Sequence, residues 1–280
     1  REGRPEAAFN PAAVIHMMRE ETQMGVLSHQ AAVITGAGTG IGAATAVRFV
    51  REGASVVLVG RRTSKLQEVA RMAGDPQRVA VVSGDVTDAA TAQSAVAACL
   101  ERFGRIDVVC NNAATFQPTS FLSCDHEEWR KVFDIIMLGA YHFTRLGALA
   151  MIERKTAGRI INVTSIHGTQ GEPNASNYGS AKAAVNQFTR CMAIELAPHN
   201  IRVNAVAPGF VDTPMAVYNG VNELENPRFL QQYVAERRIP LARASAPEEI
   251  AGTILFLASE DSSYVTGHVL VADGGLTCTF

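Results

Sequence analysis

This sequence has no large excess of positive or negative charge, no closely paired cysteines and no long apolar runs. Its 280 residues carry a formal net charge of −2, which excludes the broad positive field of a nucleic-acid-binding protein. No uninterrupted apolar run approaches the ~20 residues that cross a bilayer, and the N-terminal region lacks the apolar segment of a secretory signal. We therefore expect a cytoplasmic protein with no nucleic-acid partner and no membrane partner.

Cysteine pairs with the spacing of a metal or redox site are also missing. The five cysteines are odd in number, widely spaced and free of any CxxC motif. Reduced thiols in a cytosol explain this pattern best, and zinc binding or a disulfide scaffold is the alternative. We predict no metal site.

Aromatic residues make up only 6% of the chain, whereas 47% of it is hydrophobic, so small aliphatic residues must build the core. Short apolar runs alternate with longer helical patterns. The runs are uniformly apolar, which is typical of strands covered on both faces. They lie at residues 31–35, 55–59, 78–82, 106–110, 159–163, 202–207 and 268–272. The main helical patterns lie at 43–51, 89–103, 129–153, 181–196 and 247–258.

Seven strands that alternate with helices predict an α/β fold of the Rossmann type, with a doubly wound parallel sheet and helices on both faces. We expect one domain over residues 29–280. Residues 1–28 look like an extension outside this fold, either flexible or left by an expression vector, and a packed interface arm is the alternative. The polar, irregular segment 214–242 follows a strand end and is expected to be a substrate loop.

A glycine-rich turn joins the first strand to the first helix. Its sequence from Thr35 to Gly42 is TGAGTGIG. Glycines in this position let the backbone approach a pyrophosphate, which then accepts hydrogen bonds at the N-terminus of the helix. The strand before and the helix after supply the context that this motif needs, and a turn without a ligand is the alternative.

The second strand ends in Arg61 and Arg62, where a protein that binds NAD usually places an acidic residue. Arginine forms strong, bidentate hydrogen bonds with a phosphate group. The pair therefore favours NADP(H), with its additional phosphate, over NAD(H). Solvated surface arginines are the alternative.

A tyrosine and a lysine, Tyr178 and Lys182, stand four residues apart and share one face if the segment is helical. A nearby cation favours the phenolate and lowers the pKa of the tyrosine, which would make Tyr178 usable in acid–base chemistry. Ser165, at the end of the fifth strand, can polarise a carbonyl oxygen. An ordinary amphipathic pair is the alternative for Tyr178 and Lys182 taken alone.

Taken together, these motifs resemble those of the short-chain dehydrogenase/reductase family over about residues 30–277. The resemblance rests on 35–42, Asn111-Asn112-Ala113, Ser165, Tyr178-x3-Lys182 and Pro208-Gly209-x3-Thr213. It implies that Ser165, Tyr178 and Lys182 are catalytic. It also implies a set of cofactor-binding residues along the motifs: Gly36, Thr39, Gly40, Ile41, Gly42, Arg61, Arg62, Asp85, Val86, Asn112, Ala113, Tyr178, Lys182, Pro208, Gly209, Val211 and Thr213.

Two positions depart from the family pattern. Ala114 stands where the family usually has glycine. Ile136, seven residues after Trp129, occupies the place of a frequent fourth catalytic residue, an asparagine that holds a water in a proton relay. Isoleucine cannot hold that water, so the consequence for proton exchange stays open.

We predict an NADP(H)-dependent carbonyl reductase or alcohol dehydrogenase that acts on a small molecule. His167, Gln170 and Met215, beside the motif ends, are candidate substrate-binding residues. The alternatives are a 3-oxoacyl- or 2-enoyl-thioester reductase and a non-catalytic NADP-binding protein. The resemblance also implies a homotetramer, or a dimer, formed through the helices at about 127–153 and 178–197.

Overall fold

The computed structural model describes residues 25–278, and their framework is a parallel sheet. Its seven strands stand in the order β3-β2-β1-β4-β5-β6-β9. Their bounds are β1 Ala31–Thr35, β2 Ser55–Gly60, β3 Val79–Ser83, β4 Val108–Asn111, β5 Arg159–Val163, β6 Arg202–Pro208 and β9 Val269–Ala272. The strand order reverses between β1 and β4, so the predicted doubly wound Rossmann-type sheet is confirmed.

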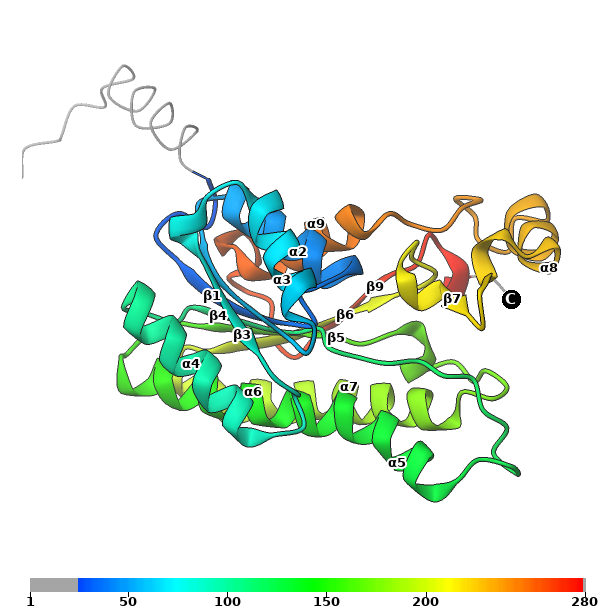
Figure 1. Cartoon of the computed structure of the whole chain (residues 1–280), viewed down its shortest axis with the longest axis horizontal. Coiled ribbons are helices and arrows are strands. Elements are labelled where there is room, and N and C mark those ends of the chain that lie inside the picture. Colours follow the sequence, from blue (N-terminus) through cyan, green and yellow to red (C-terminus); the bar gives the residue numbers. More distant parts are fainter. Residues whose placement is uncertain (1–24, 279–280) are drawn as a thin grey trace, which may run out of the picture.

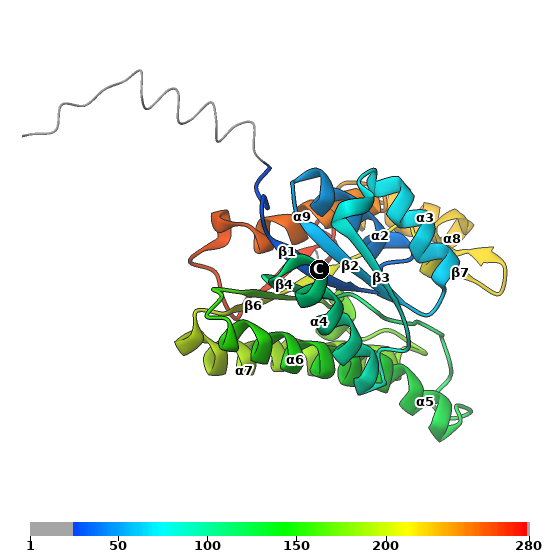
Figure 2. The same ribbon diagram turned by 60° about the vertical axis from the view of Figure 1, so that its left-hand side comes forward.

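Helices cover both faces of this sheet (Figures 1 and 2). One layer consists of α2 Gly40–Arg51, α3 Thr63–Ala73 and α9 Pro247–Ala258. The other consists of α4 Ala89–Phe103, α6 Gly139–Glu153 and α7 Ser176–Leu196. Successive residues of a strand point to opposite layers, so Ile34 joins the core under α2 while Val33 joins the core above α4. This is why the strands read as uniformly apolar.

Several helices begin earlier than the sequence pattern predicts, and the reason is local. The helix expected at 129–153 begins with α5 His126–Phe133, because the Asp125 carboxylate caps it by accepting hydrogen bonds from two backbone N–H groups. Helix α2 begins at Gly40 rather than at residue 43, and α7 at Ser176 rather than at 181. Both predicted starts therefore miss the first helical turn, which contains motif residues.

Helices α5 and α6 run together through a π-helical turn at Asp134–Leu138. The combined helix His126–Glu153 is long and apolar enough to cross a membrane, but 56% of its most apolar window is buried inside the fold. A helix that is buried to this extent inside the fold is typical of a protein core. The π turn places Ile135 and Ile136 on the inner side, next to α7.

Most of the predicted N-terminal extension, residues 1–24, lies outside the described residues. Residues 25–28 are described, and they pack on the fold, which corrects the predicted boundary at 28. The Leu27 side chain is fully buried, and its backbone N–H donates to the Glu52 carbonyl at 3.0 Å. An apolar side chain this deep in the core belongs to the domain that it packs against.

Segment 214–242 follows the end of β6 and contains short elements rather than one open loop. They are the hairpin strands β7 Val217–Tyr218 and β8 Val221–Asn222, then α8 Pro227–Phe229 with a π-helical turn at Leu230–Ala235. In Figure 1 these elements lie beyond the carboxyl end of β6. Any ligand held at that edge of the sheet therefore meets this segment.

Candidate active site

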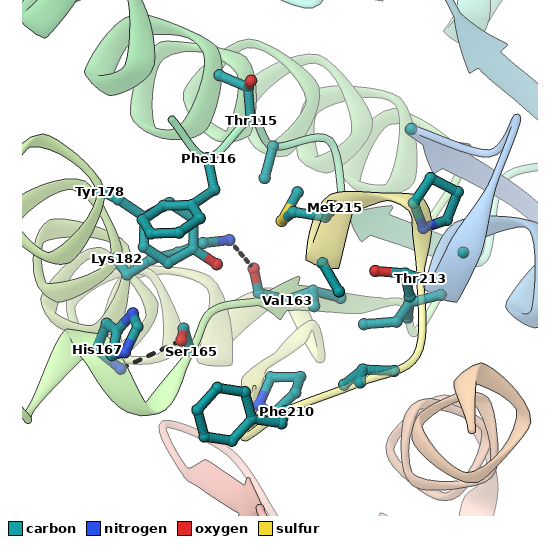
Figure 3. A pocket seen from close by; sticks show the side chains of 18 of the residues that line it. Thr115, Phe116, Val163, Ser165, His167, Tyr178, Lys182, Phe210, Thr213 and Met215 are labelled. Atoms are coloured by element: carbon teal, nitrogen blue, oxygen red, sulfur yellow. Dashed lines mark hydrogen bonds between the residues drawn. The ribbon is translucent and has the colours of Figure 1, made fainter. Parts of the chain in front are cut away.

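A cavity of about 830 Å³ lies across the carboxyl ends of the strands. In open parallel sheets, ligands bind in the crevice at the point where the strand order reverses. The cavity begins at the turn after β1, passes the ends of β2 and β4, and reaches segment 214–242. Figure 3 shows the part of it around Ser165, Tyr178 and Lys182.

The glycine-rich turn forms one end of the cavity. Gly36 and Gly40 have φ angles of +64° and +56°, a backbone region that glycine enters without strain. A Cβ atom on Gly36 would lie 2.8 Å from the Cα atom of Ala113, so a larger residue would collide with backbone. The side chain of Thr39, which precedes α2, caps none of its N–H groups, and the first turn of α2 carries no acidic residue. These N–H groups are placed to bind an anion.

Gly42 does not line the cavity, contrary to the prediction that it cradles the cofactor. A Cβ atom there would lie 2.4 Å from the Gly36 carbonyl oxygen and 2.5 Å from Nδ2 of Asn112. Gly42 therefore lets α2 pack closely on the turn. Asn112 donates from the same Nδ2 to the carbonyl oxygens of Thr35 at 3.0 Å and Gly36 at 3.3 Å, which fixes the turn's conformation.

Arg61 and Arg62 border the cavity at the end of β2, and both are exposed. Neither forms an ion pair with any residue in 25–278. Asp85 and Val86 line the neighbouring wall. The pKa of the Asp85 carboxyl is lowered, chiefly by the hydrogen bond from the Thr87 backbone, so this group stays ionised.

The opposite wall follows β6 and consists of Pro208, Gly209, Val211 and Thr213. Thr213 approaches the glycine turn closely, because its Cγ2 atom lies 3.0 Å from where a Cβ atom of Gly40 would be. The remaining predicted cofactor residues, Thr39, Ile41, Asn112 and Ala113, also line the cavity. Apart from Gly42, the structure therefore brings the whole predicted set to one site.

Ser165, Tyr178 and Lys182 meet at the middle of the cavity, on two different elements. Ser165 follows the end of β5 and caps a 3₁₀ turn at Ile166–Gly168, whereas Tyr178 and Lys182 lie in the first two turns of α7. The Lys182 ammonium donates a hydrogen bond of 2.6 Å to the Val163 carbonyl and lies 5.4 Å from the Tyr178 ring centroid (Figure 3).

Burial controls the proton affinities of the tyrosine and the lysine. It raises the pKa of Tyr178 to about 12, and a hydrogen bond with Ser165 offsets part of this rise. It lowers the pKa of Lys182 to about 7. The expectation that Lys182 lowers the Tyr178 pKa is thus wrong for the protein by itself, because desolvation opposes ionisation of the phenol more strongly.

Two of the three candidate substrate residues, His167 and Met215, line the cavity. Gln170 does not: its side chain is exposed, because the turn after Ser165 directs it outward before residues 171–174 return to the cavity wall. Sequence reasoning missed most of the aromatic lining. Phe116, Phe210, Phe229 and Tyr233 all border this region, along with Arg228 and Arg238. The i,i+4 spacing of Phe229 and Tyr233 within an otherwise polar segment was an available signal for two of them.

Comparison with known proteins agrees with this geometry. The family model described as enoyl-(acyl carrier protein) reductase matches residues 36–277. A Thermotoga maritima protein named 3-oxoacyl-[acyl-carrier-protein] reductase is 39% identical over 251 residues, covering 89% of this chain and 98% of its own. The chain belongs to the short-chain dehydrogenase/reductase family. Members of this family are oxidoreductases that bind a nicotinamide cofactor.

Other members of the family show similar extents of likeness. A Sinomonas cyclohexanicum protein named cis-4-hydroxycyclohexanecarboxylate dehydrogenase is 40% identical, with 89% of this chain and 97% of that protein covered. A Caenorhabditis elegans short-chain dehydrogenase/reductase crystallised with its cofactor has a TM-score of 0.83 at 32% identity, with 91% of this chain and 97% of that chain covered. These likenesses extend through the sheet and the cavity.

Ile136, the departure from the family pattern, is buried in an apolar cluster on the α7 side of the site. Its neighbours in this cluster include Val132, Ala140 and the ring of Tyr178. Ala114, the milder departure, lines the cavity and packs on the same cluster. The wall behind Tyr178 is therefore apolar where an asparagine would have offered polar groups.

Proposed function

We propose that this protein is an NADP(H)-dependent reductase that converts a carbonyl group to an alcohol. The observation that carries the proposal is the meeting of Ser165, Tyr178 and Lys182 in one cavity with an uncapped helix N-terminus and with Arg61 and Arg62, which form no ion pair within residues 25–278. The three side chains are suited to bind and protonate a carbonyl oxygen. The helix N-terminus and the arginines are suited to a dinucleotide with an additional phosphate.

The residues present fit the cofactor. The first turn of α2 would hold the pyrophosphate, since its N–H groups have no side-chain cap and the positive φ angles of Gly36 and Gly40 form the tight turn that leads into it. Arg61 and Arg62 would bind the 2′-phosphate, and Val211 and Thr213 would border the nicotinamide. The bound cofactor would supply the hydride.

The proton chemistry belongs to the protein. Ser165 would donate a hydrogen bond to the carbonyl oxygen and orient it toward Tyr178. Because its pKa is raised to about 12, the Tyr178 phenol keeps its proton at neutral pH and can give it to the developing alkoxide. A protonated Lys182 beside the ring would stabilise the phenolate that forms. This state of Tyr178 favours reduction over oxidation near neutral pH.

A second candidate is reduction of a 3-oxoacyl or 2-enoyl thioester. The descriptions of the matching family model and of the Thermotoga maritima relative favour it. Reduction of an isolated ketone is favoured by the aromatic side chains of the cavity wall, which offer apolar contact area to a compact substrate. A non-catalytic NADP-binding protein would have no need for the grouping of Ser165, Tyr178 and Lys182.

The assembly is proposed as a homotetramer or a dimer in the cytoplasm. Large apolar side chains on the outer faces of α6 and α7 remain exposed, among them Tyr141, Leu149 and Ile194. Such faces suit a contact between subunits. A reducing compartment suits the five cysteines, all of which are free.

A substrate panel tests the proposal. Purified protein is given NADPH or NADH with simple ketones, cyclic ketones and 3-oxoacyl and 2-enoyl thioesters, and cofactor oxidation is followed by absorbance. We expect turnover of ketones with NADPH and much weaker turnover with NADH. Preference for NADH would contradict the role of the two arginines, and turnover of thioesters alone would favour the second candidate.

A further inference from the structure

We propose that His167 selects substrates in which a ring ketone carries a hydroxyl or second oxo group beside the reacting carbonyl. This inference rests on the proposed function and specifies its substrate class. It is carried by the position of one imidazole, by its unpaired nitrogens and by the aromatic surface around it.

His167 lies in direct ring contact with the proposed proton donor. Its backbone N–H donates to Ser165 Oγ at 3.2 Å, so the two residues share one short turn. Its ring centroid is 5.9 Å from that of Tyr178, with the rings nearly perpendicular at 83°. Figure 3 shows His167 and Ser165 on the same side of the pocket. A carbonyl bound by Ser165 and Tyr178 therefore has its adjacent carbon atoms within reach of the imidazole.

The imidazole is neutral and carries unused hydrogen-bonding groups. Burial lowers its pKa, and the charge of Glu172 only partly opposes this, so at neutral pH the ring has one N–H donor and one acceptor nitrogen. Neither ring nitrogen forms a hydrogen bond within residues 25–278, and Nδ1 is completely enclosed. Nε2 is not enclosed and His167 lines the cavity, so a hydroxyl or oxo group of the substrate can give Nε2 the hydrogen-bond partner that it lacks.

The surrounding surface suits a ring rather than a flexible chain. Phe116 lies edge-on to Tyr178 at 5.0 Å and 6.3 Å from the His167 ring. A second cluster also borders the cavity, in which Phe210 contacts Phe229 and Tyr233 with centroids 4.9 Å away in each case. In the view of Figure 3, Phe116 and Phe210 lie on opposite sides of Ser165. Aromatic faces of this kind bind flat or cyclic apolar groups through large contact areas.

A matched pair of ketones tests the inference. The ratio of kcat/KM for 2-hydroxycyclohexanone to that for cyclohexanone is measured with NADPH. We expect the wild-type protein to favour the hydroxylated ketone by about tenfold to a hundredfold, the range for one hydrogen bond in a desolvated site. His167→Phe keeps an aromatic ring and removes both nitrogens, so the ratio should fall to about one. His167→Gln, which can still form a hydrogen bond, should recover part of the preference.

His199→Phe is the control, because it makes the same replacement at an exposed histidine beyond the last turn of α7, outside the cavity lining. It should leave the ratio at the wild-type value. Thermal unfolding of each variant checks that the fold is retained. A wild-type ratio near one, or a preference that survives in His167→Phe, overturns the inference while leaving the proposed function intact. Failure of the wild-type protein to reduce any carbonyl compound overturns both.

Discussion

Replacement of Lys182 should change how the stability of this protein depends on pH. The side chain is 2% exposed, and its ammonium has one hydrogen bond, to the Val163 carbonyl, and no carboxylate partner within residues 25–278. Burial lowers the folded-state pKa to about 7, whereas a lysine in the unfolded chain titrates near ~10.4. Between these values the unfolded chain holds a proton that the folded protein has released. Linkage then requires the free energy of unfolding to rise with pH over this window.

The magnitude follows from the difference between the two pKa values. It is about 3.5 units, and each unit corresponds to about 1.4 kcal/mol, so the buried charge costs about 5 kcal/mol below pH ~7. Lys182→Met removes this cost while it keeps an unbranched side chain of similar length. The variant should therefore be more stable than wild type at low pH, and its advantage should shrink by about 2–3 kcal/mol between pH ~6.5 and ~9.

Urea unfolding of wild type and Lys182→Met without cofactor, at these two pH values, gives the difference between their free energies of unfolding at each pH. Lys131→Met is the control, since Lys131 is exposed on α5 and its loss tests the removal of a positive charge at the surface. A difference between wild type and Lys182→Met that is the same at both pH values would refute the reasoning. It would mean that the folded protein does not release this proton near neutrality.

Three further predictions concern the glycine turn, the cofactor phosphate and the cysteines. Gly42→Ala should lower the free energy of unfolding by about 2–4 kcal/mol in urea titrations, because its Cβ atom would lie 2.4 Å from a backbone oxygen. The control Gly252→Ala on α9 should be neutral or stabilising, because its Cβ atom would meet nothing within 4 Å. Arg61→Ala should raise the Kd for NADPH about tenfold to a hundredfold and leave that for NADH within about twofold, and equal losses for both cofactors in calorimetric titrations would count against a phosphate contact. Cys99 and Cys110 are buried with their pKa raised to about 12, so a thiol reagent at pH ~8 should modify them only after unfolding; rapid modification in the native protein would contradict that burial.

The parts of the fold that the sequence predicted well are those in which one local pattern decides the structure. The apolar runs marked all seven strands, since the central strands are covered on both faces, although the edge strand β9 keeps Val271 exposed. The glycine motif located the turn after β1, because Gly36 and Gly40 have positive φ angles there and glycine adopts such angles without strain. Tyr178 and Lys182 share a helix, so their spacing placed them together directly.

The predictions that failed concern contacts between segments far apart in the chain. The role of Gly42 depends on Asn112, 70 residues further on, which no local pattern reveals. Leu27 looked like part of an extension until the fold supplied the core that covers it. The direction of the Tyr178 pKa shift depended on how deeply the neighbouring elements bury the phenol, whereas sequence spacing reveals a neighbouring charge but no burial. The aromatic lining likewise joins residues from three separate segments.

The central claim is that Tyr178 gives the proton to the carbonyl oxygen, and Tyr178→Phe tests it most directly. This variant keeps the ring that packs against Ile136 and removes only the hydroxyl. The measurement is kcat for NADPH-dependent reduction of the best ketone in the panel, together with the Kd for NADPH. We predict a loss of about 10²–10⁴ in kcat with the Kd changed by less than about threefold. A kcat within about twofold of wild type would contradict the account.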